Sequence, residues 1–200
     1  ANLVVIGTQG HVAYPNRANN PSTTMIKILK RLKEIKFDKG TKNFQATNLE
    51  VTKINIDNSA DNVIPGFITA SFNIRFNNKH SSISLKKKLN LIIKNITKKN
   101  NCKFKIDYMV SGESFLTKPN KTSFMIQKTI KKITKINTKF STTGGTSDAR
   151  FIRKITPCLE FGLVGGKKNG GMHKVNESTS ISDLKKLNTI YLKILENYFK

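Results

Sequence analysis

Residues 67–76, FITASFNIRF, alternate apolar and polar side chains along most of their length. An extended chain sends successive side chains to opposite faces, so a spacing of two is typical of a half-buried β-strand. Residues 48–57 alternate in the same way, and the intervening NSADNVIPG (58–66) has the Gly, Pro and Asn content of a turn. The two segments therefore predict a β-hairpin.

A helix is expected on either side of this hairpin. Residues 22–36 carry apolar side chains at helical spacing, with Ser22 as the expected N-cap, and residues 82–98 repeat that spacing. Short apolar segments at 3–7 and 103–110 predict two further strands. The resulting order, β-α-β-β-α-β, is that of the ferredoxin-like split unit.

The remainder of the chain has a different pattern. It predicts three helices and about two short strands, the helices at 120–136, 146–154 and from Ser180 or Ser182 to the end, and the strands at 140–142 and 156–161. Two strands are too few to form an independent sheet. The expected fold class is therefore α/β (α+β): a ferredoxin-like domain over residues 1–111, followed by the C-terminal part of a larger α/β domain over residues 112–200.

The charge is strongly positive, with 36 basic against 12 acidic residues and a net charge of +24. Such a balance favours non-specific attraction to phosphate. Only five of the basic residues are Arg, however, and Arg is the side chain suited to bidentate phosphate and guanine contacts. The excess Lys comes with excess Ile and Asn, as in KLNLIIKNITKKNN (88–101), and AT-rich codons explain all three. We therefore expect no nucleic-acid partner.

The expected compartment is the cytoplasm. No apolar run approaches the roughly 20 residues that cross a bilayer, and no signal-peptide pattern is visible, so no membrane partner is expected. Cys102 and Cys158 lie far apart, each beside strand-like sequence, and we interpret them as buried reduced thiols. The chain starts at Ala1 already in strand-like sequence, which we interpret as a piece cut from a longer protein.

Two of the three histidines lie in loops that could carry chemistry. His11 lies in GTQGHVAYP after the first strand, and His173 lies in the glycine-rich NGGMHKVNES before the last helix. One histidine cannot hold a catalytic metal, which needs about three protein ligands. Glu177 could join His173, cap the next helix or orient the loop. His80 is interpreted as a solvated turn residue or a contact at the start of the following helix.

Two further segments suggest sites for a carboxylate. TTGGTSDAR (142–150) combines two glycines with a helix start, where free backbone amides suit an anion, although an ordinary turn and N-cap explains it equally well. Arg75 ends the 67–76 strand among apolar neighbours, and a buried or interfacial Arg needs a carboxylate from the protein or a substrate.

Four of these segments occur together in one family. GHVAYPNRANNP, NVIPGFITASFNIRF, STTGGTSDARFI and EFGLVGG…MHKVNES follow the order found in the M20 family of metallopeptidase-like amide hydrolases, which the chain resembles over nearly all its length. The resemblance implies a two-zinc catalytic domain with an inserted ferredoxin-like lid that forms a homodimer. The lid would be residues 1–111, and residues 112–200 would be the C-terminal part of the catalytic domain.

The resemblance also implies roles for individual residues. His173 would ligate one zinc, and His11 would reach across the dimer to stabilise the oxyanion in the partner's site. Asn62 would contribute a substrate contact across the dimer interface. On the chain's own side, the substrate contacts would come from Arg75, Gly145, Thr146 and Asn169. The match of Asn169 is complicated by a GGKKNGG loop longer than the family's usual form.

The reaction implied is hydrolysis of N-succinyl-LL-2,6-diaminopimelate to succinate and LL-2,6-diaminopimelate, a step of lysine and diaminopimelate biosynthesis. It would use two zinc ions, with cobalt as a substitute. The family's HxD motif, bridging aspartate and paired glutamates lie in a segment ahead of these 200 residues, so we expect the chain alone to be inactive. The alternatives are another M20 N-acyl-amino-acid amidohydrolase, such as one acting on N-acetylornithine, or a non-catalytic dimerisation module from an eroded gene.

Overall fold

The computed structural model describes residues 1–143, 147–163 and 172–200. It divides into two compact units, Ala1–Phe115 and Leu116–Lys200, and each is described by itself. No helix in the described ranges is both long and apolar enough to span a bilayer.

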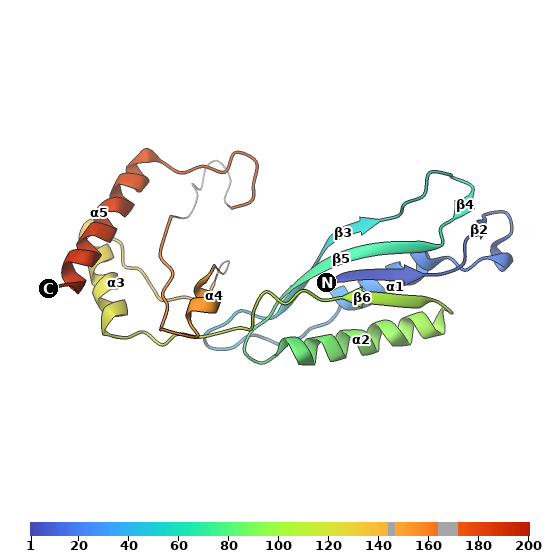
Figure 1. The fold of residues 1–200 in the computed structure, drawn as a ribbon, viewed down its shortest axis with the longest axis horizontal. Helices are drawn as coiled ribbons and strands as arrows, with labels where there is room; N and C mark the ends of the chain where they lie inside the picture. Colours follow the sequence, from blue (N-terminus) through green and yellow to red (C-terminus); the bar gives the residue numbers. More distant parts are fainter. Residues whose placement is uncertain (144–146, 164–171) are drawn as a thin grey trace. The chain divides into compact units, whose positions relative to one another are not determined.

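The first unit is built on a four-stranded antiparallel sheet in the order β3-β5-β1-β6 (Figure 1). Two helices complete the β-α-β-β-α-β order, which confirms the predicted ferredoxin-like fold. The bounds are β1 Asn2–Ile6, α1 Pro21–Lys33, β3 Asn48–Asn55, β5 Phe67–Arg75, α2 Ser82–Lys99 and β6 Lys103–Asp107.

The core lies between the helices and one face of this sheet. Leu3 pairs with Ala70 and Val5 with Ile68, and all four side chains are buried. The helices contribute the other fully buried apolar side chains, Met25, Ile28 and Leu32 from α1 and Leu89 and Ile93 from α2. Each such side chain stabilises the fold by roughly 1.5–3 kcal/mol relative to its exposed state.

On the opposite face of the sheet most side chains of β5 are polar, although Val4, Ile6 and Phe67 also lie there. There Ser71 pairs with Asn2 across β5 and β1, and the Ser71 hydroxyl donates a hydrogen bond of 2.9 Å to Asn2 Oδ1. The alternation read from residues 67–76 therefore separates a core face from a polar face, as a half-buried strand requires.

The start of α1 differs from the prediction. Asn20, not Ser22, is the N-cap, and its side chain accepts a hydrogen bond of 2.9 Å from the Ser22 amide. Pro21 then occupies the first helical position, where its lack of an N–H costs nothing. In α2 the cap is Ser81, which forms a reciprocal capping box with Ser84.

The second unit is helical in its described part. It contains α3 Lys121–Thr134, α4 Ala149–Ile152 and α5 Ile181–Tyr198. Helices α3 and α5 pack through the buried Ile130 and Ile190, and the Asn197 amide donates to Thr129 Oγ1 at 3.1 Å. The strands predicted at 140–142 and 156–161 are wrong, because neither segment has a strand partner among the described residues.

This second unit buries little apolar surface. Within its described residues the buried apolar side chains are Ile130, Ala149 and Ile190. Large apolar side chains are exposed along the same stretch, among them Ile155 at 90%, Val175 at 87% and Phe199 at 80%. Such exposure marks a surface that other protein normally covers.

Asp38 organises the connection from α1 to β3. Its side chain is 5% exposed and accepts hydrogen bonds from the Gly40 amide at 2.6 Å, Asn77 Nδ2 at 2.7 Å and the Thr47 amide at 3.3 Å. His80 Nε2 lies 3.0 Å away on Oδ2. Burial alone would raise the pKa of Asp38, but the hydrogen bonds from Thr47, Gly40 and Asn77 hold this pKa well below its usual range.

Asp38→Asn should lower the free energy of unfolding by about 2 kcal/mol at pH 7, because buried donors lose a charged acceptor. A depressed carboxylate pKa stabilises the fold above the unfolded-state pKa of about 4, and this stabilisation is lost as pH falls below it. The difference in free energy of unfolding between wild type and Asp38→Asn, measured by urea unfolding, should therefore be smaller at pH 3 than at pH 7. Asp107→Asn, at the exposed end of β6, is the control. A gap that is the same at both pH values contradicts this account.

Gly7 allows the chain leaving β1 to pass close to the start of α1. A Cβ at Gly7 would lie 2.1 Å from the Asn19 carbonyl oxygen and 2.9 Å from Pro21 Cδ. Asn19 cannot withdraw cheaply, because its backbone exchanges two hydrogen bonds of 2.9 Å with Thr8.

Gly7→Ala should therefore destabilise the chain by about 2 kcal/mol in urea unfolding, as overpacking does. Gly66→Ala is the matched control, since its Cβ would meet Gln9 Cβ at an ordinary 3.7 Å. Equal effects of the two substitutions would show that the close approach is unimportant.

Candidate functional site

A short second ladder brings two of the predicted site residues together. Strand β2, Gly10–His11, pairs antiparallel with β4, Val63–Ile64, with His11 opposite Val63. The Val12 amide donates a hydrogen bond of 3.0 Å to the Asn62 carbonyl. The β2–β4 ladder lies beyond one end of the main sheet (Figure 1), and it brings His11 close to Asn62, which directly precedes β4 and is 51 positions away in sequence.

The His11 side chain is exposed but held in place. Its Nδ1 accepts a hydrogen bond of 3.0 Å from the Ala13 amide, and its carbonyl accepts one of 2.9 Å from the Tyr14 amide. The Tyr14 ring lies beside the imidazole, with centroids 5.9 Å apart, and Arg17 Cζ stacks 5.5 Å from the Tyr14 centroid. The 3₁₀ turn Pro15–Arg17 carries that guanidinium.

Arg75 lies at the opposite end of the sheet from His11. Arg75 is the last of the nine residues of β5. The first residue of this strand, Phe67, comes shortly after β4 in the chain. At about 3.3 Å per residue the strand spans roughly 26 Å. Arg75 is exposed and faces Asn48 across the ladder, so nothing in its surroundings demands a carboxylate from the chain itself. The structure therefore does not bring Arg75 together with His11 and Asn62.

His173 lies in a tight turn with its side chain exposed. Its φ of 65° is in the left-handed region, as is that of Asn176 at 64°. The His173 amide donates to Glu177 Oε2 at 3.1 Å, so the glutamate binds the backbone of the loop. The sequence allows Glu177 to join His173 as a ligand, to cap the next helix or to orient the loop, and this contact supports the last of these roles. Left-handed backbone at a non-glycine residue is uncommon and is concentrated at functional sites.

The described residues do not complete a metal site. No group of three or more His, Cys, Asp or Glu in the described ranges is close enough to hold an ion. His173 fits the role of one ligand, being a solvent-accessible imidazole on an ordered turn, but a catalytic zinc needs about three. The ligand set of a two-metal centre is therefore not supplied by the described part of this chain.

The other predicted substrate contacts fall outside the described residues, namely Gly145, Thr146 and Asn169. The neighbouring Ser147 is described, and it binds a carboxylate of the protein itself. Both its amide, at 3.1 Å, and its hydroxyl, at 2.6 Å, donate to Glu160 Oε1. This contact within the chain leaves both readings of residues 142–150 open, a carboxylate site and an ordinary turn with an N-cap.

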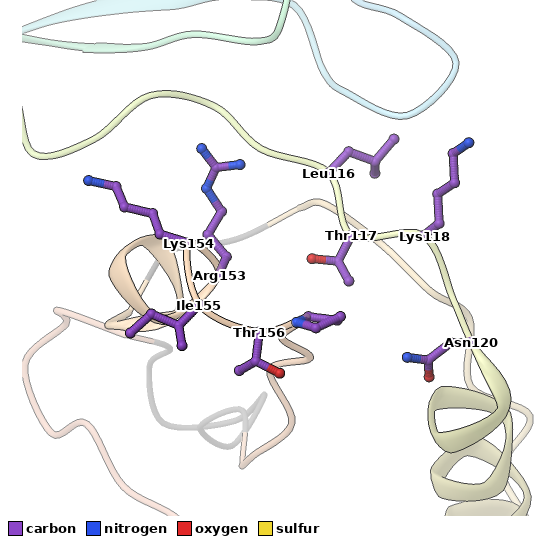
Figure 2. Close-up of a pocket in the computed structure, with 9 residues that line it drawn as sticks. Leu116, Thr117, Lys118, Asn120, Arg153, Lys154, Ile155 and Thr156 are labelled. Atoms are coloured by element: carbon purple, nitrogen blue, oxygen red, sulfur yellow. The ribbon is translucent and has the colours of Figure 1, made fainter.

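A surface hollow of about 440 Å³ lies within the second unit. Figure 2 shows Leu116 to Asn120 on one side of it and Arg153 to Thr156 on the other. Lys118, Arg153 and Lys154 make it basic, yet none of the predicted site residues lines it. We assign it no catalytic role, because it contains no acid, base or nucleophile in a reactive arrangement.

The comparisons with known proteins match both the sequence and the fold. The family model of the peptidase dimerisation domain of M20 proteins matches residues 1–101. The succinyl-diaminopimelate desuccinylase of Pelagibacter ubique is 72% identical over 199 residues, covering 100% of this chain and 51% of the relative. That of Rickettsia bellii is 47% identical over 193 residues, covering 96% of this chain and 48% of the relative.

A solved structure shows the same fold in spite of low identity. A tripeptidase from Staphylococcus aureus superimposes with a TM-score of 0.77 at 19% identity, covering 96% of this chain and 49% of the tripeptidase. The chain therefore spans about half the length of the proteins it matches. From the match over residues 1–101 together with the ferredoxin-like unit, we conclude that the chain belongs to the M20 peptidase dimerisation-domain family.

Proposed function

We propose that this chain is part of a succinyl-diaminopimelate desuccinylase, which hydrolyses N-succinyl-LL-2,6-diaminopimelate to succinate and LL-2,6-diaminopimelate. The observation that carries the proposal is the 72% identity to the Pelagibacter ubique desuccinylase across 199 residues. The match covers 100% of this chain, so the segments that contain His11, Gly145, Thr146 and Asn169 all lie within it.

The intact enzyme would use metal ions, zinc or cobalt, to activate water and polarise the amide carbonyl. His173 would supply one ligand. The family resemblance assigns the other ligands and the general base to the part of the enzyme that these 200 residues do not span, and the relatives are about twice as long as this chain.

The distance along β5 supports a site shared between two copies. His11 and Asn62 lie at one end of a strand of roughly 26 Å, and Arg75 lies at the other. A single small substrate cannot touch both ends. We therefore propose a homodimer through the first unit, in which the β2–β4 end of one copy completes the site that contains Arg75 of the other.

Within that shared site each residue has a distinct task. His11 would donate a hydrogen bond to the oxyanion that forms at the succinyl amide, with Asn62 beside it. Arg75 and the backbone at Gly145 and Thr146 would bind the substrate's carboxylates, for which a guanidinium offers paired donors. Asn169 would contact the substrate from the loop that precedes His173.

Two other functions have an observation in their favour. The likeness to a tripeptidase supports an amide hydrolase of the same family acting on another substrate, such as N-acetylornithine. The match of the family model to the dimerisation domain supports a non-catalytic dimerisation module. We propose a cytoplasmic enzyme without nucleic-acid or membrane partners; the described cysteines are free thiols, with Cys102 buried and Cys158 half-buried, which fits a reducing compartment.

The whole protein should hydrolyse N-succinyl-LL-2,6-diaminopimelate with a kcat/KM at least about tenfold above that for N-acetylornithine, because the succinyl carboxylate adds a charged contact. A chelator should abolish the activity, and zinc should restore it. The 200-residue chain with added zinc should release no more succinate than its His173→Ala variant does.

Three results would contradict the proposal. A preference of the whole protein for N-acetylornithine indicates the other amidohydrolase. Absence of hydrolysis with either substrate in the presence of zinc indicates the dimerisation module. Succinate release by the 200-residue chain above its His173→Ala control shows that residues 1–200 contain a complete site.

A further inference from the structure

His11 takes part in a local hydrogen bond that determines where its ring carries a proton. The Ala13 amide donates to His11 Nδ1 at 3.0 Å. In a neutral imidazole one nitrogen is a donor and the other an acceptor. A nitrogen that accepts an N–H is unprotonated, so the ring proton must reside on Nε2.

We infer that Ala13 is a positioning residue, whose backbone amide fixes His11 as the Nε2–H tautomer and so presents a donor to the reacting carbonyl. The inference rests on the proposed function, in which His11 stabilises an oxyanion. With the opposite tautomer the ring would present a lone pair at Nε2 and repel the developing negative charge.

The backbone around this contact is fixed independently of the side chain. The Tyr14 amide closes a turn on the His11 carbonyl at 2.9 Å, and the Val12 amide binds Asn62 at 3.0 Å. The β2–β4 ladder holds His11 opposite Val63. The Ala13 amide is therefore directed by the main chain and not by the imidazole that accepts from it.

The Tyr14 ring lies beside the imidazole. Its centroid is 5.9 Å from that of the imidazole at an interplanar angle of 57°, and Arg17 covers it at 5.5 Å. Rotating the imidazole by half a turn would remove Nδ1 from the Ala13 amide and leave that amide without its acceptor. The contact with the backbone amide therefore distinguishes the two ring orientations.

Two substitutions separate the two ends of the imidazole. In His11→Asn, the side-chain oxygen can occupy the position of Nδ1 and accept a hydrogen bond from the Ala13 amide. Asn side chains in turns commonly accept from the backbone amide two residues later in this way. No donor of the Asn side chain, however, reaches the position of Nε2. In His11→Gln, the longer amide can place a donor near the position of Nε2, but it has no acceptor atom at the position of Nδ1.

The first measurement uses the 200-residue chain and needs no activity. ¹⁵N NMR at neutral pH should show His11 with Nε2 protonated and Nδ1 unprotonated, with a scalar coupling between Nδ1 and the Ala13 amide nitrogen. The Ala13 amide should exchange with solvent slowly in wild type and His11→Asn, and faster in His11→Gln. A protonated Nδ1, or equal exchange rates in wild type and His11→Gln, overturns the inference.

The second measurement uses the whole enzyme and the succinylated substrate. His11→Asn should lower kcat by about 10²–10³-fold with little change in KM, as loss of an oxyanion donor does. His11→Gln should lower kcat by about tenfold or less. A larger kcat for His11→Asn than for His11→Gln overturns the inference. Wild-type kcat in both variants, with the NMR result as expected, refutes the oxyanion role of His11 in the proposed function and leaves the tautomer assignment standing.

Discussion

The antiparallel pairing of β1 with β5 is the constraint on which the rest of the first unit depends. It sets Leu3 and Val5 against Ala70 and Ile68, and this places the apolar half of two alternating strands under both helices. A shift of one residue in this register would turn every core side chain to the polar face. At one end of this pairing the chain extends beyond the sheet. Strand β2 follows β1 there, strand β4 precedes β5, and the two form the β2–β4 ladder.

The two units differ in how much of their own apolar surface they bury. The first unit closes a core around its sheet, and it surrounds the buried Asp38 carboxylate with hydrogen-bond donors. The second unit packs α3 on α5 but leaves residues such as Ile155 and Phe199 exposed. The first unit thus buries most of its large apolar side chains in one core, whereas the described part of the second unit does not.

The elements that local patterns specify could be predicted from the sequence. The alternation in residues 67–76 and the helical spacing in residues 82–98 depend only on residues that are close in sequence. The structure has the predicted strand and the predicted helix at these positions. The N-cap of the first helix was misplaced by two residues, because Asn20 and Ser22 are both good caps and only the geometry chooses between them. The strands expected at 140–142 and 156–161 failed, because a strand needs a partner that its own residues do not encode.

The candidate site was predictable only as separate motifs. Sequence marked His11, Asn62, Arg75 and His173 but could not give the pairing of β2 with β4, which is two residues long and joins segments far apart. It also gave no sign that the Ala13 amide binds His11, since that contact depends on backbone conformation. The position of Arg75 follows from the length and direction of β5, and it separates Arg75 from the histidine expected to share its substrate.

Complementation between two inactive variants of the whole enzyme tests the shared site most directly. His11→Ala removes the residue given to the partner, and His173→Ala removes a metal ligand of the chain's own site. If His11 acts across the dimer, a mixed dimer has one intact site, and random mixing after subunit exchange should restore about a quarter of wild-type activity. If His11 served the site of its own chain, neither site of a mixed dimer would be intact, and absence of recovery despite confirmed exchange would contradict the account.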